Sequence, residues 1–504
     1  MPSQAASHNR SRKKNKKKRL KKNGSQPRNP ATDRFFWDLD FDPDSSLGLQ
    51  AENEPFLSIW EATAPNESPV RFFMTESRAA KRVMPGVELV AQFCSDDNLE
   101  KLRSGNSPGM QEEVALMDDR TNNGVQSTPR DYLGPLSAHG LYLALKRKRF
   151  YVGEDTLGEN SGGGLSQADL SPYTVMALIS TASTSQANAL RGSLYRHLAF
   201  KCYLNTTYPL AFDLPYYALR TAPRYRPPRD TRTIADNGPL RKVKDLSFLR
   251  RRSRDDAPIL DVDYLCEAQT TVLVTGLGPW RWVAYCFTDT YFEHEDNRED
   301  VNFYHTAREV EDGHVLFQPD PFTAASTEAS RPRLDAREYF VTVFKTRLDQ
   351  KKDEWDGVVS NMRSRIHSYI EDCPIKIADI QSRNFDDPHV VRQARHTVVE
   401  TRSLLRLLIQ KLKETISKTN SFKSNEVFKT VPGRASEYVP EIQKSIQDLE
   451  TSLDALQSLD KDCDAYNDGL SFHLNHEGTR DANIQARLAS FNQVRQSSFS
   501  NNTA

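Results

Sequence analysis

The stretch ILDVDYLCEAQTTVLVTGLGPWRWVAYCFTDTYF, residues 259–292, decides the fold expected for this chain. It contains two mostly apolar runs, residues 272–274 and residues 280–287, on either side of a Gly-Leu-Gly-Pro turn. Apolar runs rich in β-branched or aromatic residues around such a turn are typical of a β-hairpin. Because few polar residues interrupt either run, we expect both strands to be covered on both faces, at the centre of the main core.

The turn of this hairpin contains a Gly-x-Gly pair, but its sequence does not fit a nucleotide-binding loop. The third glycine is missing, and a proline follows where a phosphate-binding helix would begin. We therefore interpret the hairpin residues as structural: Gly276, Gly278, Pro279, Trp280 and Trp282.

Composition allows two or three domains in 504 residues. A hydrophobic content of 37% and a charged content of 27% favour sizeable segments outside any packed core. The six cysteines are scattered without a C-x-x-C pair, which disfavours zinc ribbons and thioredoxin-like motifs. Without a recognisable signal peptide, we expect reduced thiols in an intracellular protein, cytoplasmic or nuclear. No apolar stretch reaches the roughly 20 residues that a bilayer span needs.

The N-terminal part contains a basic run, RSRKKNKKKRLKK, which we expect to be disordered. The candidate targeting or phosphate-binding residues are Arg10, Arg12, Lys13, Lys14, Lys16, Lys17, Lys18, Arg19, Lys21 and Lys22. Such a run serves nuclear import, binds nucleic-acid phosphates, attracts anionic lipid or is simply a solvated tail. No aromatic residue interleaves with the lysines, which disfavours base stacking. Residues 224–254 are rich in proline and arginine and are predicted to form a solvated loop. Their densest basic part, residues 250–254, is a second candidate phosphate patch, although two aspartates directly follow it.

Between this tail and the hairpin, short patterns predict individual elements. Residues 70–74 and 87–93 have the composition of short strands, residues 95–133 of a polar loop, and residues 146–152 of another strand. The glycine-rich segment 153–167 is expected to be a surface insertion.

Two helices and an edge-like strand are expected before the hairpin. Ser171 followed by Pro172 suits the N-cap and first position of a helix. A second helix is indicated by leucines at helical spacing, and His197 on it is interpreted as partly exposed rather than as a catalytic base. Residues 211–217 form the edge-like strand, because Pro215 cannot donate to a ladder.

After the hairpin comes an acidic, histidine-containing segment, EHEDNREDVNFYH. Its potential metal ligands are Glu293, His294, Glu295, Asp296, Glu299, Asp300 and His305. Their spacing matches neither a zincin nor an EF-hand. A solvated acidic loop is the default interpretation, and a weak surface for Mg²⁺ is the alternative, so no cofactor is predicted beyond that.

From residue 335 onward the sequence predicts three long helices with apolar residues in alternating three- and four-residue steps. The first contains Val341, Phe344, Leu348, Trp355, Val358, Met362, Ile366 and Tyr369, the second Val391, Ala394, Val398, Leu405, Leu408 and Leu412, and the third Val439, Ile442, Ile446, Leu449, Leu453, Leu456, Cys463, Leu470 and Leu474. Lys351 interrupts the first seam, and its stem is expected to lie along it. Sustained heptads specify packed helices, either within one chain or between protomers.

The expected fold is therefore α/β or α+β: a mixed sheet with flanking helices, followed by a long-helix, coiled-coil-like bundle. The expected divisions are a basic tail (1–33), a poorly structured segment with short strands and a linker (34–136), an α/β domain (137–330), an antiparallel helical bundle (331–495) and a short tail (496–504). The chain contains no Walker, nucleophile-elbow, kinase or zincin motif, so it is predicted not to be an enzyme.

Several segments together resemble a family of filamentous-fungal proteins, some of which look like CorA-type divalent-cation transporters near the C-terminus. The matching pieces include SPYTVMALISTAS, SLYRHLAF, FDLPYYALR, KDLSFL, the hairpin stretch and REYFVTVFKTRLDQKKDEWDGVV. The resemblance spans about residues 147–487 and implies a cytosolic α/β domain followed by long stalk helices. The membrane spans and the Gly-Met-Asn motif of CorA-type proteins are absent, so no pore residue is carried over.

Three functions remain open at this point. The first is a non-enzymatic protein that acts through protein contacts, with a partner or as a homo-oligomer, along helices 335–495. The second is the cytosolic part of a truncated or incomplete CorA-like magnesium transporter, which alone would place the chain at a membrane. The third is a nuclear, nucleic-acid-associated protein that uses its basic tail as a site for an anionic partner.

Overall fold

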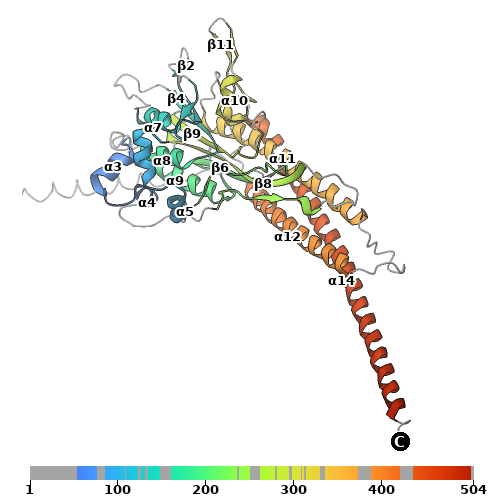
Figure 1. Cartoon of the computed structure of the whole chain (residues 1–504). Helices are drawn as coiled ribbons and strands as arrows, with labels where there is room; N and C mark the ends of the chain where they lie inside the picture. Colours follow the sequence, from blue (N-terminus) through green and yellow to red (C-terminus); the bar gives the residue numbers. More distant parts are fainter. Residues whose placement is uncertain are drawn as a thin grey trace, which may run out of the picture. The chain divides into compact units, whose positions relative to one another are not determined.

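The structure is a computed structural model of the chain. It describes residues 54–75, 86–107, 109–122, 127–130, 134–147, 160–234, 238–249, 261–278, 281–294, 298–307, 309–311, 314–329, 335–372, 388–420 and 435–500. All of these residues belong to one compact unit. Its elements confirm the expected class, a mixed sheet with flanking helices followed by long C-terminal helices (Figure 1).

The predicted hairpin is confirmed. Its strands are β8 (Asp261–Gly278) and β9 (Arg281–Thr288), which pair antiparallel with Leu273 opposite Tyr285. An irregularity at the turn lies between Gly276 and Gly278. Most side chains of both strands are buried on either face, as expected for a central hairpin. Pro279 and Trp280 lie outside the described residues.

The described strands form a nine-stranded sheet in the order β2-β1-β4-β9-β8-β6-β5, with β3 beside β1 and β7 beside β8. The remaining bounds are β1 Glu113–Asn122, β2 Ser127–Arg130, β3 Leu136–Ser137, β4 Asn160–Ala168, β5 Tyr203–Asn205, β6 Leu210–Pro223 and β7 Val243–Asp245. Strands β4 and β9 run parallel, whereas the other pairs run antiparallel. The sheet is therefore mixed, as predicted.

The glycine-rich segment is not a surface insertion where the structure describes it. Its second half forms β4, which lies between β1 and β9 and buries Leu165 completely. A Cβ atom at Gly164 would lie only 3.0 Å from the ring of Phe322. Glycine in a strand often marks such a close approach, and here it lets an aromatic ring rest on the sheet. The prediction of a surface insertion from the low complexity of this segment was therefore wrong.

The edge-like strand is longer than predicted. Strand β6 pairs with β8 along its whole length, and β5 covers its other side only at residues 211–213. Pro215 lies beyond the end of β5, where the described part of the chain provides no strand on that side. Proline is tolerated at such a position because its missing N–H interrupts no central ladder.

Short helices cover one face of the sheet, and two of them replace predicted strands. They are α3 Phe56–Thr63, α4 Pro69–Phe73, α5 Val87–Phe93, α6 Asp97–Ser104, α7 Ala138–Lys146, α8 Pro172–Thr181 and α9 Thr184–Leu198. In α5 the buried side chains are Val87, Val90 and Phe93, a three-residue spacing that marks a helical face. The strand predictions at residues 70–74 and 87–93 were therefore wrong, because runs this short fit both periods.

Other local predictions in the same region were wrong in some places and confirmed in others. The polar stretch 95–133 contains α6 and β1 rather than a continuous loop. The strand expected at residues 146–152 begins at the last residue of α7, and residues 148–152 lie outside the described part. The N-cap prediction is confirmed: Ser171 and Thr174 form a reciprocal capping box at the start of α8.

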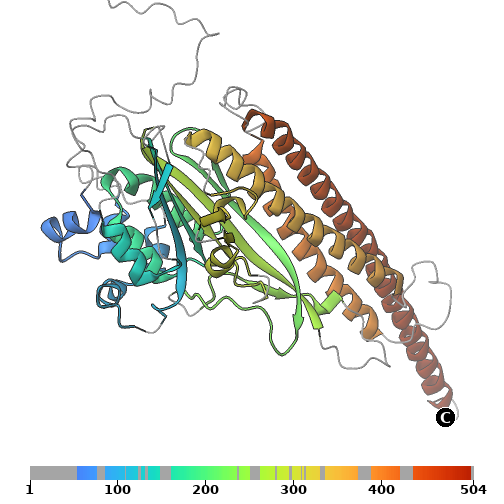
Figure 2. The ribbon, with the colours of Figure 1, turned by 90° about the horizontal axis from the view of Figure 1, so that it is seen from above.

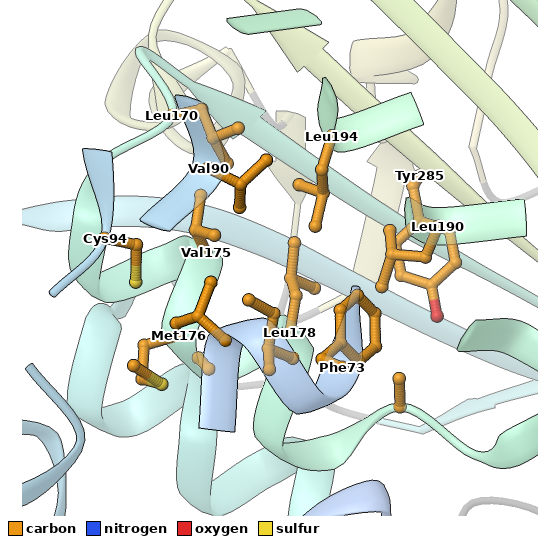
Figure 3. Close-up of a cluster of buried hydrophobic side chains, with 14 of the residues drawn as sticks. Phe73, Val90, Cys94, Leu170, Val175, Met176, Leu178, Leu190, Leu194 and Tyr285 are labelled. Atoms are coloured by element: carbon orange, nitrogen blue, oxygen red, sulfur yellow. The ribbon is translucent and has the colours of Figure 1, made fainter. Parts of the chain in front are cut away.

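These helices and the sheet share one apolar core. Figure 3 shows Val175, Met176 and Leu178 of α8 and Leu190 and Leu194 of α9 beside Tyr285 of the sheet. Phe73 from α4 joins the same cluster, so the N-terminal helices are part of the core. Packing of this kind supplies most of the stability of short helices, which are marginal by themselves.

The three long helices lie on the other side of the sheet, two of them against its face and the third packed on those two (Figure 2). They are α11 Ala336–Asp372, α12 Pro388–Thr419 and α14 Ala435–Ser500. In the chain, the short elements between β9 and α11 are α10 Val301–Thr306, β10 Glu309–Glu311, β11 His314–Phe317 and η6 Pro321–Thr323, and η4 Ser247–Leu249 lies between β7 and β8. Phe212 of β6 meets Phe344 of α11 with ring centroids 5.2 Å apart. The described helices include none that is long and apolar enough to span a bilayer.

The predicted heptad seams are buried. All seam residues of α12 are buried, as are those of α11 except the half-buried Tyr369. In α14, Val439, Leu453 and Leu474 are half-buried and the other seam residues are buried. Helix α14 packs against both α11 and α12. It runs parallel to α11 and antiparallel to α12, so consecutive helices alternate in direction within one chain.

Candidate functional site

A buried polar cluster lies where the parallel strands β4 and β9 end. Asp289 directly follows β9, and its carboxylate accepts hydrogen bonds from Arg241 Nε (2.6 Å), Arg232 Nη1 (2.7 Å) and the Gln269 N–H (2.9 Å). The carboxyl ends of parallel strands are common places for ligand sites, so this cluster is the first candidate.

Each arginine of the cluster has further partners. Arg232 is held by both carboxylate oxygens of Asp230 at 2.8 Å, and Arg241 donates to the His197 carbonyl at 2.7 Å. All of these side chains are buried. The segment that carries both arginines was interpreted as a solvated loop, and this is wrong for these two residues. Nothing in the local sequence shows that the aspartate they share, Asp289, lies elsewhere in the chain.

Asp169 directly follows β4, as Asp289 follows β9, and it is likewise a carboxylate that accepts several hydrogen bonds. Its backbone has a positive φ of 47°. Its carboxylate accepts from the Thr290 N–H and hydroxyl at 2.8 Å, and from Arg298. Aspartate tolerates the left-handed region better than most residues, because its short side chain bonds nearby backbone groups. This carboxylate therefore ties the end of β4 to the end of β9.

His197 is fully buried, which corrects the expectation of partial exposure. Its Nδ1 lies 3.0 Å from Thr271 Oγ1, and its Nε2 lies 3.5 Å from Asp289 Oδ1. This is the connectivity of an Asp-His-Thr triad. However, the Thr271 hydroxyl donates to Asp213 at 2.6 Å, and none of the four side chains reaches solvent. The arrangement is a closed network rather than an accessible nucleophile.

Burial and charge set the protonation of this network. Burial lowers the pKa of His197, so the neutral imidazole is favoured despite Asp289. Burial alone would raise the pKa of Asp289, but Arg232 and Arg241 outweigh it and hold that pKa well below its usual range. Burial raises the pKa of Asp213 to about 6, although Arg196 lies 2.6 Å away. The cluster therefore contains matched charges around a neutral histidine.

The candidate metal ligands are dispersed among other roles. Glu293 and Glu354 together hold the guanidinium of Arg220, with distances of 3.1 Å and 2.9 Å. Asp300 caps α10, and Glu299 accepts from the Tyr304 hydroxyl at 3.0 Å.

The remaining candidates give no cluster either. His294 and His305 are exposed, while Glu295 and Asp296 lie outside the described residues. Within the part of the chain that the structure describes, no group of three or more such ligands could hold a metal ion. The basic tail and residues 250–254 also lie outside that part.

Two buried cations lie on the opposite face of the sheet, on successive turns of α11. Lys351 is buried, and its ammonium lies 3.8 Å from the centre of the Tyr216 ring. Arg347 donates to the Phe322 carbonyl at 2.8 Å and to Gln350 at 2.9 Å. Neither has a carboxylate at ion-pair distance among the described residues. Burial, with Arg347 nearby, lowers the pKa of Lys351 to about 7.

The helix contacts carry specific polar pairs beside their apolar seams. Ser445 and Ser452 of α14 donate to Asp349 and Asp356 of α11, at 2.5 Å and 2.7 Å. Both pairs are one heptad apart on each helix, so they fix the register between α11 and α14. On the other side of α14, Arg402 of α12 pairs with Asp460 at 3.2 Å.

The second candidate site is the part of α14 beyond the bundle. Leu470 is fully buried, whereas Phe472 is 63% exposed. One heptad beyond Leu470 and Leu474, the seam positions hold the acidic residues Glu477 and Asp481. Two heptads beyond, they hold Ile484 and Leu488, which are 46% and 58% exposed. Residues 482–490 are all exposed. Apolar residues thus return to the seam positions, after one acidic heptad, where the described elements no longer cover them.

Comparison with known proteins gives little further guidance. No family model matches the chain, and no curated protein matches its sequence. The structure is similar to a solved structure described as the full-length CmaX protein, with 10% identical residues and a TM-score of 0.38. The similarity covers 76% of this chain and 84% of that one. Similarity at this level does not identify a family, so the CorA-type resemblance stays a prediction.

Proposed function

We propose that this chain is a non-enzymatic protein-contact module that associates with a second copy of itself through α14 beyond Leu470. The observation that carries the proposal is the return of apolar residues to the α14 seam at the exposed Ile484 and Leu488. Burying a side chain of this kind contributes about 1.5–3 kcal/mol.

The occupant is argued from the seam itself. Up to Leu470, α14 packs its seam against two helices of its own chain. After one heptad with acidic residues at the seam positions, apolar residues return at the same spacing with Ile484 and Leu488. A heptad seam is complementary to another heptad seam, and an identical helix provides one at matching positions. Two copies of residues 471–490 would therefore cover each other.

The non-enzymatic part of the proposal is supported by the buried network. The one triad-like arrangement described above has His197, Thr271, Asp213 and Asp289 fully enclosed. Its hydroxyl is already engaged as a donor to a carboxylate. A nucleophile and base need access to substrate, which a closed network does not offer.

The test is the solution mass of the full chain by light scattering over a concentration series. We expect a dimer or larger assembly that Ile484→Asp together with Leu488→Asp converts to monomer, with at least a tenfold rise in the dissociation constant. The control is Ala482→Asp with Ala486→Asp, which adds the same charge at the same spacing beside the seam.

Two results would contradict the proposal. One is a wild-type chain that stays monomeric at high micromolar concentration, and the other is equal mass for the seam and control variants. The series is repeated in 5 mM MgCl₂, where the mass should not change. A magnesium-dependent rise to a ring-sized oligomer would favour the transporter-derived alternative instead.

A further inference from the structure

A groove lies between α12 and α14, within the part of α14 that belongs to the bundle. Its volume is about 490 Å³, which is within the range of ligand pockets. It is lined by Arg406, Ile409, Gln410, Lys413, Gln457, Asp460 and Lys461. The groove is open to solvent, and it is independent of the exposed seam beyond Leu470.

The charges of this groove are unbalanced. It has three basic side chains and one acidic one, and Asp460 is already engaged by Arg402 at 3.2 Å, with Arg406 at 4.0 Å. Lys413 and Lys461 are exposed, and neither has a carboxylate at ion-pair distance among the residues described for these helices. The rim of the groove is therefore cationic.

The rest of the exposed face of α12 has the same character. Arg392 and Arg395 are exposed upstream of the groove. The two glutamates of this helix are engaged elsewhere: Glu400 pairs with Lys244 at 3.4 Å, and Glu414 with Lys411 at 3.0 Å. Apolar Leu407 is exposed beside the groove. A cationic face with an exposed leucine indicates a partner that is both acidic and apolar.

We propose that the groove between α12 and α14 binds a short acidic peptide segment of a partner protein, with an apolar side chain of that peptide inserted between the helices. The floor for this side chain is formed by Ile409 and the aliphatic stems of the long polar residues. Arg406, Lys413 and Lys461 then face the peptide carboxylates at the rim.

The shape of the site favours a peptide over other polyanions. A nucleic-acid duplex or a lipid surface would contact the outermost basic residues without filling a concave groove. An inserted side chain with flanking carboxylates uses both the hollow and the charges. Recognition of an apolar anchor in a groove, with charges that orient it, is a recurrent mode of peptide binding.

The experiment measures binding of a fluorescein-labelled probe peptide, Asp-Glu-Asp-Glu-Phe-Leu-Asp-Glu-Asp-Glu, to the full chain by fluorescence anisotropy. We expect saturable binding that weakens at least tenfold in the double variant Lys413→Glu, Lys461→Glu. Replacing Phe-Leu in the probe by Ser-Ser should weaken binding about tenfold as well. Raising NaCl from 50 to 500 mM should reduce affinity, because exposed charges are screened.

The matched control is Arg363→Glu with Lys444→Glu, which makes the same charge change on exposed residues of α11 and α14 away from the groove. It should retain binding within about twofold. Thermal unfolding of each variant verifies that the fold is kept. Equal loss in the control and groove variants, or no effect of the Phe-Leu replacement, would overturn the proposal. So would tighter binding of a 20-base-pair duplex or of phosphatidylserine vesicles with the same dependence on Lys413 and Lys461.

Discussion

The two faces of the central sheet both bury charge, but they compensate it differently. On the α9 face, Asp289 is shared by Arg232 and Arg241, and every charge of the cluster has an opposite charge beside it. On the α11 face, Arg347 and Lys351 are also buried, and their hydrogen-bond and cation–π partners are carbonyl groups, an amide and an aromatic ring. The buried charges of the α9 face are therefore held in ion pairs, whereas Arg347 and Lys351 are buried without one among the described residues.

The cost of removing a charge from water is thus met in different ways on the two faces. Removing a charge from water is expensive unless an opposite charge and hydrogen bonds replace the lost hydration. The α9 face supplies both, at the price of bringing distant residues together. On the α11 face no carboxylate pairs with Lys351 among the described residues, so burial, with Arg347 nearby, lowers the pKa of Lys351 more than Glu354 and Glu299 raise it.

The largest effect is expected from breaking the compensated face. Asp289→Asn leaves two buried arginines without their shared carboxylate, and we expect a loss of about 3–5 kcal/mol in the free energy of unfolding. Urea unfolding followed by circular dichroism measures it. The exposed Asp454→Asn should stay within about 0.5 kcal/mol of the wild type. A loss under about 1 kcal/mol for Asp289→Asn would show that the cluster is not a matched ionic network.

The uncompensated face should respond in the opposite direction. Lys351→Met removes a buried cation but keeps its volume, so at pH 6 we expect a gain of about 1–3 kcal/mol in the free energy of unfolding. The folded pKa of about 7 lies below the ordinary value of 10.5. Between these values the unfolded chain keeps a proton that the folded chain lacks, so wild-type stability falls as pH drops toward 7. The gain should therefore fade by about pH 10.

Urea unfolding at pH 6, 8 and 10 distinguishes this effect from packing alone. Lys352→Met is the control, because its ammonium pairs with Asp353 at 2.9 Å and is only partly buried. That variant should show no gain at any pH. If Lys351→Met gains the same free energy of unfolding at pH 6 and pH 10, the variant is stabilised by relief of strain and not by removal of the buried charge.

The smallest effect concerns Asp213, a paired carboxylate on the compensated face whose pKa burial nevertheless raises to about 6. Between its ordinary value of 3.8 and 6 the folded chain keeps a proton that the unfolded chain has lost, so this group lowers stability as pH rises. Relative to the wild type, Asp213→Asn should gain about 1–2 kcal/mol between pH 4.5 and pH 6.5. A constant difference across this range would mean that Arg196 compensates Asp213 fully.

Local sequence patterns were reliable where one period dominates a long stretch. The hairpin around Gly276, the capping box at Ser171 and the heptads of the long helices are all present in the structure. They failed where a run was too short for its period to be distinguished, as in α5, or where glycine content was interpreted as a loop, as in β4. In both cases packing against the rest of the core decided the local structure.

The candidate sites were harder to predict from the sequence than the fold was. The heptad seam that becomes exposed at Ile484 can be counted in the sequence, but only the structure shows where its partners end. The α12–α14 groove requires the antiparallel pairing of two helices, which brings Lys413 and Lys461 to the same groove. No local window contains both residues.

The sequence by itself determined the periodic elements: the central hairpin, the capped helix and the three heptad helices, because each depends on neighbours within a few turns. Only the tertiary structure decided which charges are buried and whether they are paired. Asp169, Arg232 and Asp289 are far apart in the chain, and they meet only because β4 and β9 run parallel and end together. Burial gives these pairs their strength, and burial is a property of the whole fold.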